Sequence, residues 1–221
     1  MKKLIIIALV LVSVSVKAQN LQLHYDFGNG RKYLTSTIEM FKPDNYGNTF
    51  FFVDFNYNAQ GPQEGYWEIA REFQKWKAPI AFHVEYNGGL HADNNLALQF
   101  NNAYLLGAAY SWNAEDYSKG FTFQALYKYI QGNVSPNNFQ LTGVWYLNFL
   151  NDKMTFTGFA DFWRETQQSI NTKYIYNAEP QLWFNINKSF AVGSEVEVDY
   201  NFASIKGLTI FPTLGVKWTM Q

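Results

Sequence analysis

The sequence predicts an all-β protein: an antiparallel up-and-down transmembrane β-barrel of about twelve strands, preceded by a cleaved N-terminal signal peptide. Three observations predict this fold class: a short apolar leader, a two-residue alternation of apolar and polar side chains, and an unusual composition. Aromatic residues make up 19% of the chain and charged residues only 16%. The mean hydropathy is slightly negative, at −0.24, which fits a barrel because only alternate residues of each strand face lipid.

The N-terminus has the parts of a secretory signal peptide. Two lysines precede an apolar run over residues 4–12, and residues 16–18 (Val-Lys-Ala) carry small side chains at the outer positions that signal peptidase reads. We expect residues 1–18 to be removed and residues 19–221 to form the barrel. The apolar run is too short for a membrane-spanning helix, which needs roughly 20 residues.

Composition excludes several classes of partner and site. Because the leader contains three lysines, the formal charge of −1 becomes −4 in the mature chain, and nucleic acid is not an expected partner. The sequence has no cysteine, so it forms no disulfide and no thiolate metal site. His91 and Asp93 lie close together, but zinc needs three or four ligands. We expect neither a metal nor a cofactor.

The alternation identifies the strands. Over residues 21–27 every odd residue is apolar or aromatic and every even residue is polar, which gives a strand two unlike faces. Over residues 192–200, three acids oppose valines and a tyrosine in the same way. The predicted strands are 20–28, 32–42, 49–58, 65–74, 80–88, 101–112, 120–131, 138–149, 153–164, 174–186, 190–201 and 208–220.

Short turn sequences separate most of these strands, so neighbouring strands should pair antiparallel. An even number of strands places both termini on one side, which is the periplasm for an outer-membrane barrel. The longest expected loops, 87–100 and 164–173, both fall on the opposite side. Strands of about ten residues match the 9–11 that cross a bilayer at a tilt.

Aromatic residues gather near the predicted strand ends, where they can anchor a barrel at the two membrane interfaces. They are Tyr25, Phe27, Tyr57, Tyr110, Trp112, Tyr127, Tyr129, Phe149 and Trp218. A soluble, aromatic-rich sandwich is the alternative fold. Arg71 falls on the lipid-facing side, where it would cost about 2–4 kcal/mol at mid-membrane. We therefore expect it near the periplasmic end, unless the register slips there.

The run YLTSTIEMFKPDNYGNTFFFVDFNY at 33–57 and the strand around 67–73 resemble the Tsx-like family, nucleoside-specific channel-forming proteins of the outer membrane. A weaker similarity covers 101–104 and 139–163. The resemblance touches about half of the mature chain and implies a nucleoside channel. The chain departs from the family in being shorter than typical members. Its last residues, Trp218-Thr219-Met220-Gln221, also do not end on the aromatic residue that many outer-membrane barrels carry.

The face opposite the apolar one should line the lumen, and it is rich in acids and aromatic rings. It contains His24, Asp26, Glu39, Asp54, Glu68, Glu72, His83, Glu85, Lys128, Asp161, Glu179, Glu195, Glu197, Asp199 and Lys217, with Phe50, Phe52, Phe159, Trp163 and Phe211. Rings can stack on a heteroaromatic base, and carboxylates can accept hydrogen bonds from sugar hydroxyls. The candidate substrate-binding residues are Phe52, Asp54, Glu68, His83, Glu85, Phe159, Asp161, Glu179, Glu195 and Glu197. Each could instead be a structural strut that fills the barrel.

The sequence therefore predicts a non-enzymatic channel for passive, selective diffusion of small solutes, with nucleosides implied by the resemblance. We expect a monomer that contacts outer-membrane lipids and the barrel-assembly machinery. One alternative is a structural barrel plugged by its own side chains. The other is a rim-active lipid-modifying enzyme, in which Ser36 or Ser111 acts with a histidine such as His83, two residues from Glu85 on the same face.

Overall fold

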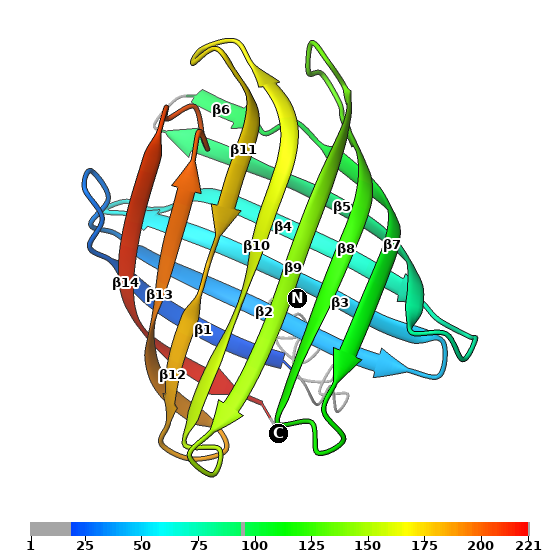
Figure 1. Ribbon diagram of the computed structural model, residues 1–221. Helices are drawn as coiled ribbons and strands as arrows, with labels where there is room; N and C mark the ends of the chain where they lie inside the picture. Colours follow the sequence, from blue (N-terminus) through cyan, green and yellow to red (C-terminus); the bar gives the residue numbers. More distant parts are fainter. Residues whose placement is uncertain (1–18, 94–95, 221) are drawn as a thin grey trace, which may run out of the picture.

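The computed structural model describes residues 19–93 and 96–220, which form one antiparallel sheet that closes into a barrel (Figure 1). The predicted signal peptide, residues 1–18, lies outside the described residues. In this described part of the chain, no helix is long and apolar enough to cross a membrane. The strands are β1 (Gln19–Asp26), β2 (Leu34–Asp44), β3 (Gly47–Asn58), β4 (Gly61–Phe73), β5 (Ile80–Asp93), β6 (Leu96–Gln99), β7 (Ala103–Asn113), β8 (Lys119–Ile130), β9 (Asn137–Phe149), β10 (Met154–Gln167), β11 (Thr172–Ala178), β12 (Gln181–Asn185), β13 (Phe190–Tyr200) and β14 (Leu208–Thr219).

The wall of the barrel has twelve strand positions. The hydrogen-bonded order runs β10, β12, β13, β14, β1, β2, β3, β4, β5, β7, β8 and β9, and β9 pairs with β10 to close the sheet. β11 and β12 are two parts of one wall strand, because both pair with β10 and with β13. β6 lies off this closed path and pairs with β5. The predicted twelve-stranded antiparallel barrel is therefore confirmed.

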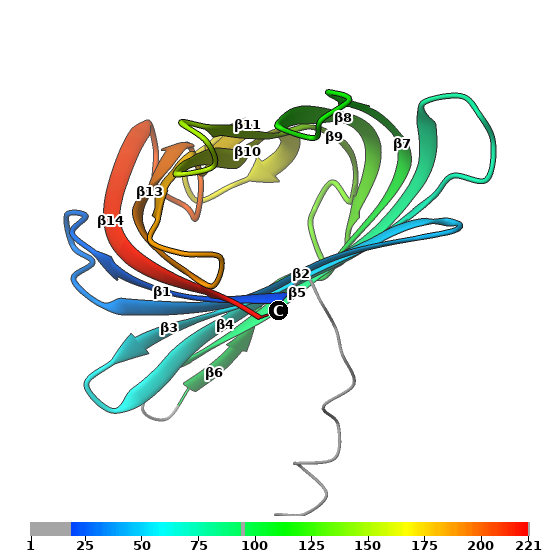
Figure 2. The same ribbon diagram turned by 90° about the horizontal axis from the view of Figure 1, so that it is seen from below.

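Both ends of the described chain lie at the same end of the barrel. Asn20 in β1 is the register partner of Thr219 in β14. We call this the terminal end and the opposite opening the distal mouth. Along the barrel, β1 to β5 form a flatter side and β7 to β14 an arched side (Figure 2). β3 and β10 are six positions apart in the wall of twelve, so they face each other across the interior.

Two predicted loops are wrong in part, because strands continue into them. β5 runs on to Asp93 and pairs with β6 within the predicted loop 87–100, and β10 extends to Gln167 within the predicted loop 164–173. Gly88 and Gly89 fall in the predicted loop 87–100, but both lie inside β5. A Cβ atom on Gly89 would meet the ring of Phe100, and one on Gly88 would meet the side chains of Tyr86 and Trp67. These glycines therefore allow close packing rather than chain reversal.

The strand predicted at 174–186 is also interrupted. β11 ends at Ala178 and β12 begins at Gln181. Between them lies Pro180, which has no N–H group for a ladder hydrogen bond. The Glu179 N–H still donates to the Phe159 carbonyl at 3.1 Å, and the Pro180 carbonyl accepts from Val196 at 3.0 Å. The wall therefore stays closed through the interruption.

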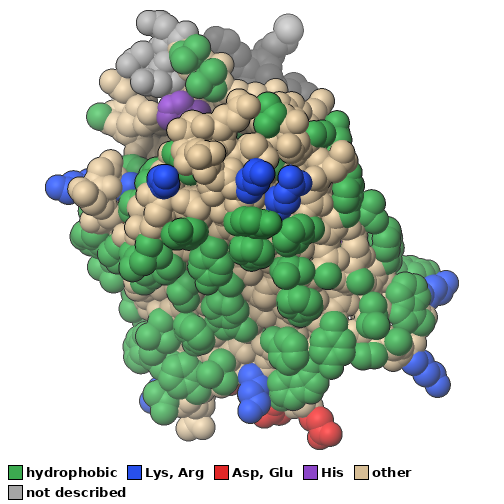
Figure 3. Space-filling view, turned by 45° about the horizontal axis from the view of Figure 1, so that its top comes forward, with side chains coloured by type: hydrophobic (Ala, Val, Ile, Leu, Met, Phe, Trp, Pro, Cys, Tyr) green, Lys and Arg blue, Asp and Glu red, His purple; other side chains and the backbone are tan. Residues whose placement is uncertain are grey.

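The exterior is apolar and the interior polar. In β1, Leu21, Leu23 and Tyr25 are 37–42% exposed, whereas Gln22, His24 and Asp26 are only 2–3% exposed. A band of apolar side chains covers the face shown in Figure 3, with charged side chains concentrated above and below it. A soluble sandwich would bury the apolar side chains and expose the polar ones. The alternative fold is therefore wrong. The predicted anchors Tyr25, Phe27, Tyr110, Trp112, Tyr127, Tyr129 and Trp218 are exposed on the outer wall, whereas Tyr57 and Phe149 are half-buried.

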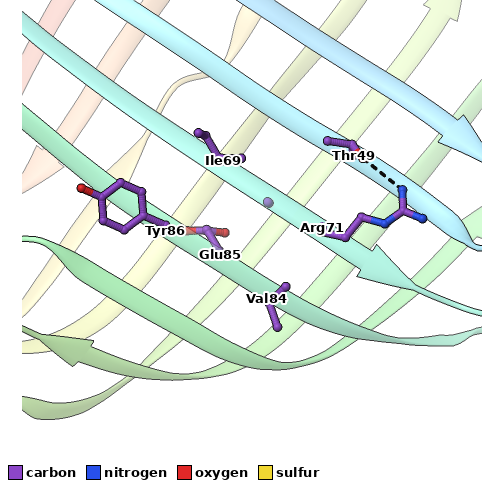
Figure 4. A pocket seen from close by; sticks show the side chains of 7 residues that line it. Thr49, Ile69, Arg71, Val84, Glu85 and Tyr86 are labelled. Carbon is purple, nitrogen blue, oxygen red and sulfur yellow. Dashed lines mark hydrogen bonds between the residues drawn. The ribbon is translucent and has the colours of Figure 1, made fainter.

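Arg71 lies on the outer face at the terminal end of β4. Its guanidinium donates to the two carboxylate oxygens of Asp44 at 2.7 and 2.9 Å and to the Thr49 hydroxyl at 3.0 Å. Asp44 ends β2 at the hairpin to β3, so the charge sits at the edge of the barrel. It borders a shallow depression of about 290 Å³ on the outer wall, shared with Ile69 and Val84 (Figure 4). The predicted register at Arg71 is correct.

The lumen as the candidate functional site

The interior face carries a large excess of acid. Contacts between strands that are not neighbours in the wall identify this face, because such contacts must cross the interior. Gln124 of β8 donates to Glu72 of β4 at 3.4 Å, and the rings of His24 of β1 and Trp183 of β12 lie 5.5 Å apart. Interior acids are Asp26, Glu39, Asp54, Glu64, Glu68, Glu72, Glu85, Asp161, Glu165, Glu179, Glu195, Glu197 and Asp199, and interior bases are Arg31, Lys128 and Lys217. Among the residues that the structure describes, thirteen interior carboxylates against three interior cations give a formal charge of −10 when the histidines are neutral.

One group of acids, the β3–β13 acid cluster, comprises Asp54, Glu179, Glu195 and Glu197. Thr37 donates to Asp54 at 2.5 Å and Gln181 donates to Glu195 at 2.6 Å. Glu179 interacts electrostatically with the other three, although β3 is four wall positions from β13. Four predicted site residues from distant parts of the chain are therefore brought together.

A second group, the β4–β10 acid cluster, comprises Glu68, Glu85 and Asp161. Glu68 accepts hydrogen bonds from the Tyr66 hydroxyl at 2.7 Å and from the Asn87 amide at 2.9 Å. Glu68 also interacts electrostatically with Glu85 and with Asp161 from β10. One carboxylate oxygen of Asp161 is buried and has no hydrogen-bond partner. Three further predicted site residues thus converge on one part of the interior.

His83 joins the second group to a neighbouring acid. Its ring nitrogens lie 2.9 Å from Glu85 and 3.4 Å from Glu72, and the residue is 2% exposed. Glu72 also accepts from the Asn48 amide at 2.8 Å. These contacts hold the imidazole between two carboxylates, so its placement fits a structural link better than a free contact for a solute.

The two predicted stacking rings lie on opposite walls. Phe52 in β3 is part of an aromatic row, with ring centroids 6.1 Å from Phe50 and 5.9 Å from Tyr66. Phe159 lies in β10, across the interior, and its carbonyl accepts the Glu179 N–H. Each ring is half-buried. Phe52 is the register partner of Glu68, and Phe159 lies two residues before Asp161 on the same face. The arrangement offers flat apolar surfaces next to hydrogen-bond acceptors.

Residues 18–220 match the family model described as "Domain of unknown function (DUF5020)". The chain belongs to this family. None of the curated proteins matches the DUF5020 chain significantly. Among solved structures it is similar to the "NanC porin", with a TM-score of 0.61 and 12% identity over 92% of this chain and 100% of that one. It is also similar to the "KdgM porin", with a TM-score of 0.53 and 12% identity over 92% and 99%. The fold of the DUF5020 chain is that of these porins.

The serines considered for a rim enzyme have other partners in the DUF5020 barrel. The Ser36 hydroxyl lies on the outer face, 2.8 Å from that of Tyr57, and the Ser111 hydroxyl lies 2.8 Å from that of Thr122. His91 contacts Glu64 at 3.2 Å. Within residues 19–93 and 96–220, neither serine forms a hydrogen bond with a histidine, and no group of three His, Cys, Asp or Glu side chains is placed to hold a metal ion.

Several interior residues of the DUF5020 barrel were not predicted. Glu64 and Glu165 lie one residue beyond the predicted strands 65–74 and 153–164. Tyr66 precedes Glu68 by two residues, so the alternation could have placed it in the lumen. Trp183 is fully buried inside the barrel and has the Lys217 ammonium 4.2 Å above its ring; the same alternation within the predicted strand 174–186 could have identified it. Arg31 lies in a turn, where no periodicity exists, and no sequence signal indicates that it points inward.

Proposed function

We propose that the DUF5020 chain is a passive channel of the bacterial outer membrane for small neutral and cationic solutes, with nucleosides as preferred permeants. The observation that carries this proposal is the acid-rich, aromatic interior of a closed barrel whose outer wall is apolar. A twelve-stranded barrel is wider than the eight-stranded kind that side chains fill completely. The porin fold supports the same reading.

The charge of the interior determines which solutes enter. A formal charge of −10 inside a low-dielectric wall focuses the field and can raise the local concentration of cations by about 10–10³-fold. The same field lowers the local concentration of anions. Asp54 and Glu195 accept hydrogen bonds from the neutral side chains of Thr37 and Gln181, and Glu68 accepts from Tyr66 and Asn87. These three carboxyl groups therefore remain open to contacts with a permeating solute.

Nucleosides suit the chemistry of the lining. Phe52 and Phe159 present ring faces from opposite walls, and base stacking on such rings contributes about 1–3 kcal/mol in other proteins. Asp54, Glu68 and Glu179 offer acceptors for ribose hydroxyls. The choice of nucleosides also draws on the resemblance of residues 33–57 to Tsx-like channels, whereas the family match and the porin structures indicate no nucleoside. Several weak contacts in sequence suit a channel better than one tight pocket, because the solute must also leave.

A plugged structural barrel is the second candidate, and a specific observation favours it. Several interior side chains are almost fully buried, among them Leu105, Ile175 and Trp183, at 0–2% exposure. These fill part of the cross-section. The cluster residues Asp54, Glu68 and Glu195 are instead half-buried, which supports a narrow water-filled path beside the packed region.

Liposome swelling separates these functions. We expect purified protein in vesicles to admit nucleosides faster than sugars of equal size and faster than nucleotides. Phe52→Ala and Asp54→Asn should each reduce this preference while the folded barrel keeps its heat-dependent mobility on gels. Phe51→Ala, on the outer face of the same strand, is the matched control. Equal rates for nucleosides and sugars would contradict nucleoside selectivity, and no flux would favour the plugged barrel.

We propose a monomer with both termini in the periplasm, inserted by the barrel-assembly machinery into outer-membrane lipid. The turn between β13 and β14, at residues 201–207, then lies outside the cell. An epitope inserted there should be stained on intact cells, whereas one inserted between β12 and β13, at residues 186–189, should not. Staining of the second epitope alone would reverse the proposed orientation.

A further inference from the structure

The loop between β1 and β2 turns Arg31 back into the distal mouth. The turn is tight: the Arg31 N–H donates to the Gly28 carbonyl at 3.1 Å, and the Gly28 N–H donates to the Asp26 carboxylate at 2.6 Å. Gly30 and Lys32 on either side of Arg31 have positive φ values of 81° and 79°. These left-handed residues reverse the chain twice, so the Arg31 side chain points toward the wall while Lys32 is exposed.

The Arg31 guanidinium bridges two strands across a third. One of its terminal nitrogens lies 3.1 Å from Asp26 of β1 and 2.5 Å from Glu197 of β13, and the other donates to Glu197 at 2.8 Å. Its central carbon lies 3.6 Å above the ring of Phe211, which belongs to β14 between these strands. The side chain retains 20% of its surface. The guanidinium thus lies along the inner wall and links β1 to β13.

The charges around Arg31 hold it in this place. Although burial opposes its charge, the hydrogen bonds and charge of Glu197 raise the pKa of Arg31 above its ordinary value. Arg31 is therefore cationic at neutral pH, as a guanidinium is in proteins generally. The other two interior cations have different partners: Lys128 donates to Gln140 at 2.7 Å, and Lys217 lies over Trp183. Arg31 is therefore the interior cation that is ion-paired at the distal mouth.

We propose that Arg31 sets the ion selectivity of the distal mouth. By pairing with Asp26 and with Glu197, the cluster acid nearest the distal mouth, it withholds two carboxylates from solutes that enter, so that the strong negative field begins only at the acids deeper in the barrel. This inference rests on the proposed channel function and assigns the residue that determines which charges pass the entrance. A bidentate guanidinium fits the role, because a lysine ammonium cannot bond both oxygens of Glu197 in one plane.

The test is the reversal potential of single channels in planar bilayers under a KCl gradient. Arg31→Gln should raise the ratio of cation to anion permeability above that of the unaltered protein. The difference should be largest at about 0.1 M salt, where the Debye length is about 10 Å, and small at about 1 M, where it is about 3 Å. Arg31→Lys should give an intermediate ratio.

Lys32→Asn is the matched control. It removes the same charge one residue away, and asparagine accepts the left-handed backbone of this position. We expect the ratio for Lys32→Asn to equal that of the unaltered protein. If Arg31→Gln also equals the unaltered protein, or shifts no more than Lys32→Asn, the proposal is overturned while the channel function stands.

The two proposals fail in different ways. If the unaltered protein does not conduct and Arg31→Gln does, passive diffusion is contradicted but control of the mouth by Arg31 is supported. If neither conducts although both migrate as folded barrels, both proposals are overturned. Heat-dependent mobility on gels reports the folding of each variant.

Discussion

Leu214→Arg places a charge at the middle of the outer wall and tests the assignment of the lipid-facing side. Leu214 lies near the middle of β14, points outward and is 62% exposed. An arginine at the bilayer midplane of a β-barrel costs about 2–4 kcal/mol, whereas one near the interface costs about 0–1 kcal/mol. At 1.4 kcal/mol per factor of ten, the midplane cost corresponds to about 30–700-fold in the unfolding equilibrium.

Leu208→Arg is the control on the same strand and face, with 65% exposure. Six residues at about 3.4 Å per residue separate the positions by about 20 Å along the strand. At a tilt of about 45°, this is about 14 Å of depth, close to half of the 30 Å hydrocarbon core. Leu208 should therefore lie at the membrane boundary when Leu214 lies at the centre.

The assay is a urea titration of the barrel in lipid vesicles, followed by tryptophan fluorescence. We expect the free energy of unfolding to fall by about 2–4 kcal/mol for Leu214→Arg and by less than about 1 kcal/mol for Leu208→Arg. Equal and small losses would refute the reasoning, because the middle of the outer wall would then be in contact with water.

The same titration tests the packed interior and the interrupted strand. Trp183→Ala should lower the free energy of unfolding by about 3–5 kcal/mol, since it removes a fully buried side chain. Trp218→Ala, which removes an outward ring that is 44% exposed, should lower it by less. Equal losses would mean that the interior around Trp183 is not packed. Gly158→Ala should cost about 1–3 kcal/mol, because φ is 151° and a Cβ atom would meet the Glu179 carbonyl. Gly143→Ala, with open space around its Cβ, should cost less, and the reverse order would contradict this account of the interruption.

Alternation along the strands was enough to predict which side chains enter the interior. His24 and Asp54 are examples: each follows an outward residue by one position, and each lies inside the barrel. A single strand already carries this information, because successive side chains point to opposite faces. The strand count followed from the same pattern, since every run has the length needed to cross a membrane.

Contacts between distant strands could not be predicted. Glu179 lies close enough to Asp54 for their charges to interact only because the sheet closes into a barrel. No local sequence pattern predicts that closure. Arg31 was missed for a related reason: its direction depends on two left-handed residues in a turn. Pro180 could have predicted the interruption, because proline has no N–H group for a ladder hydrogen bond. The alternation on both sides of it predicted a continuous strand instead.

The β5–β6 ribbon limits how deeply the barrel can sink. In the described part of the chain, β6 pairs with β5 on one side and has no strand on the other. Free N–H and C=O groups are not tolerated in hydrocarbon, so lipid must stop short of residues 96–99. The β5–β6 ribbon therefore fixes the membrane boundary at the distal mouth. In a thicker or thinner bilayer, only the boundary at the terminal end, where Arg71 and Asp44 lie, can shift along the barrel.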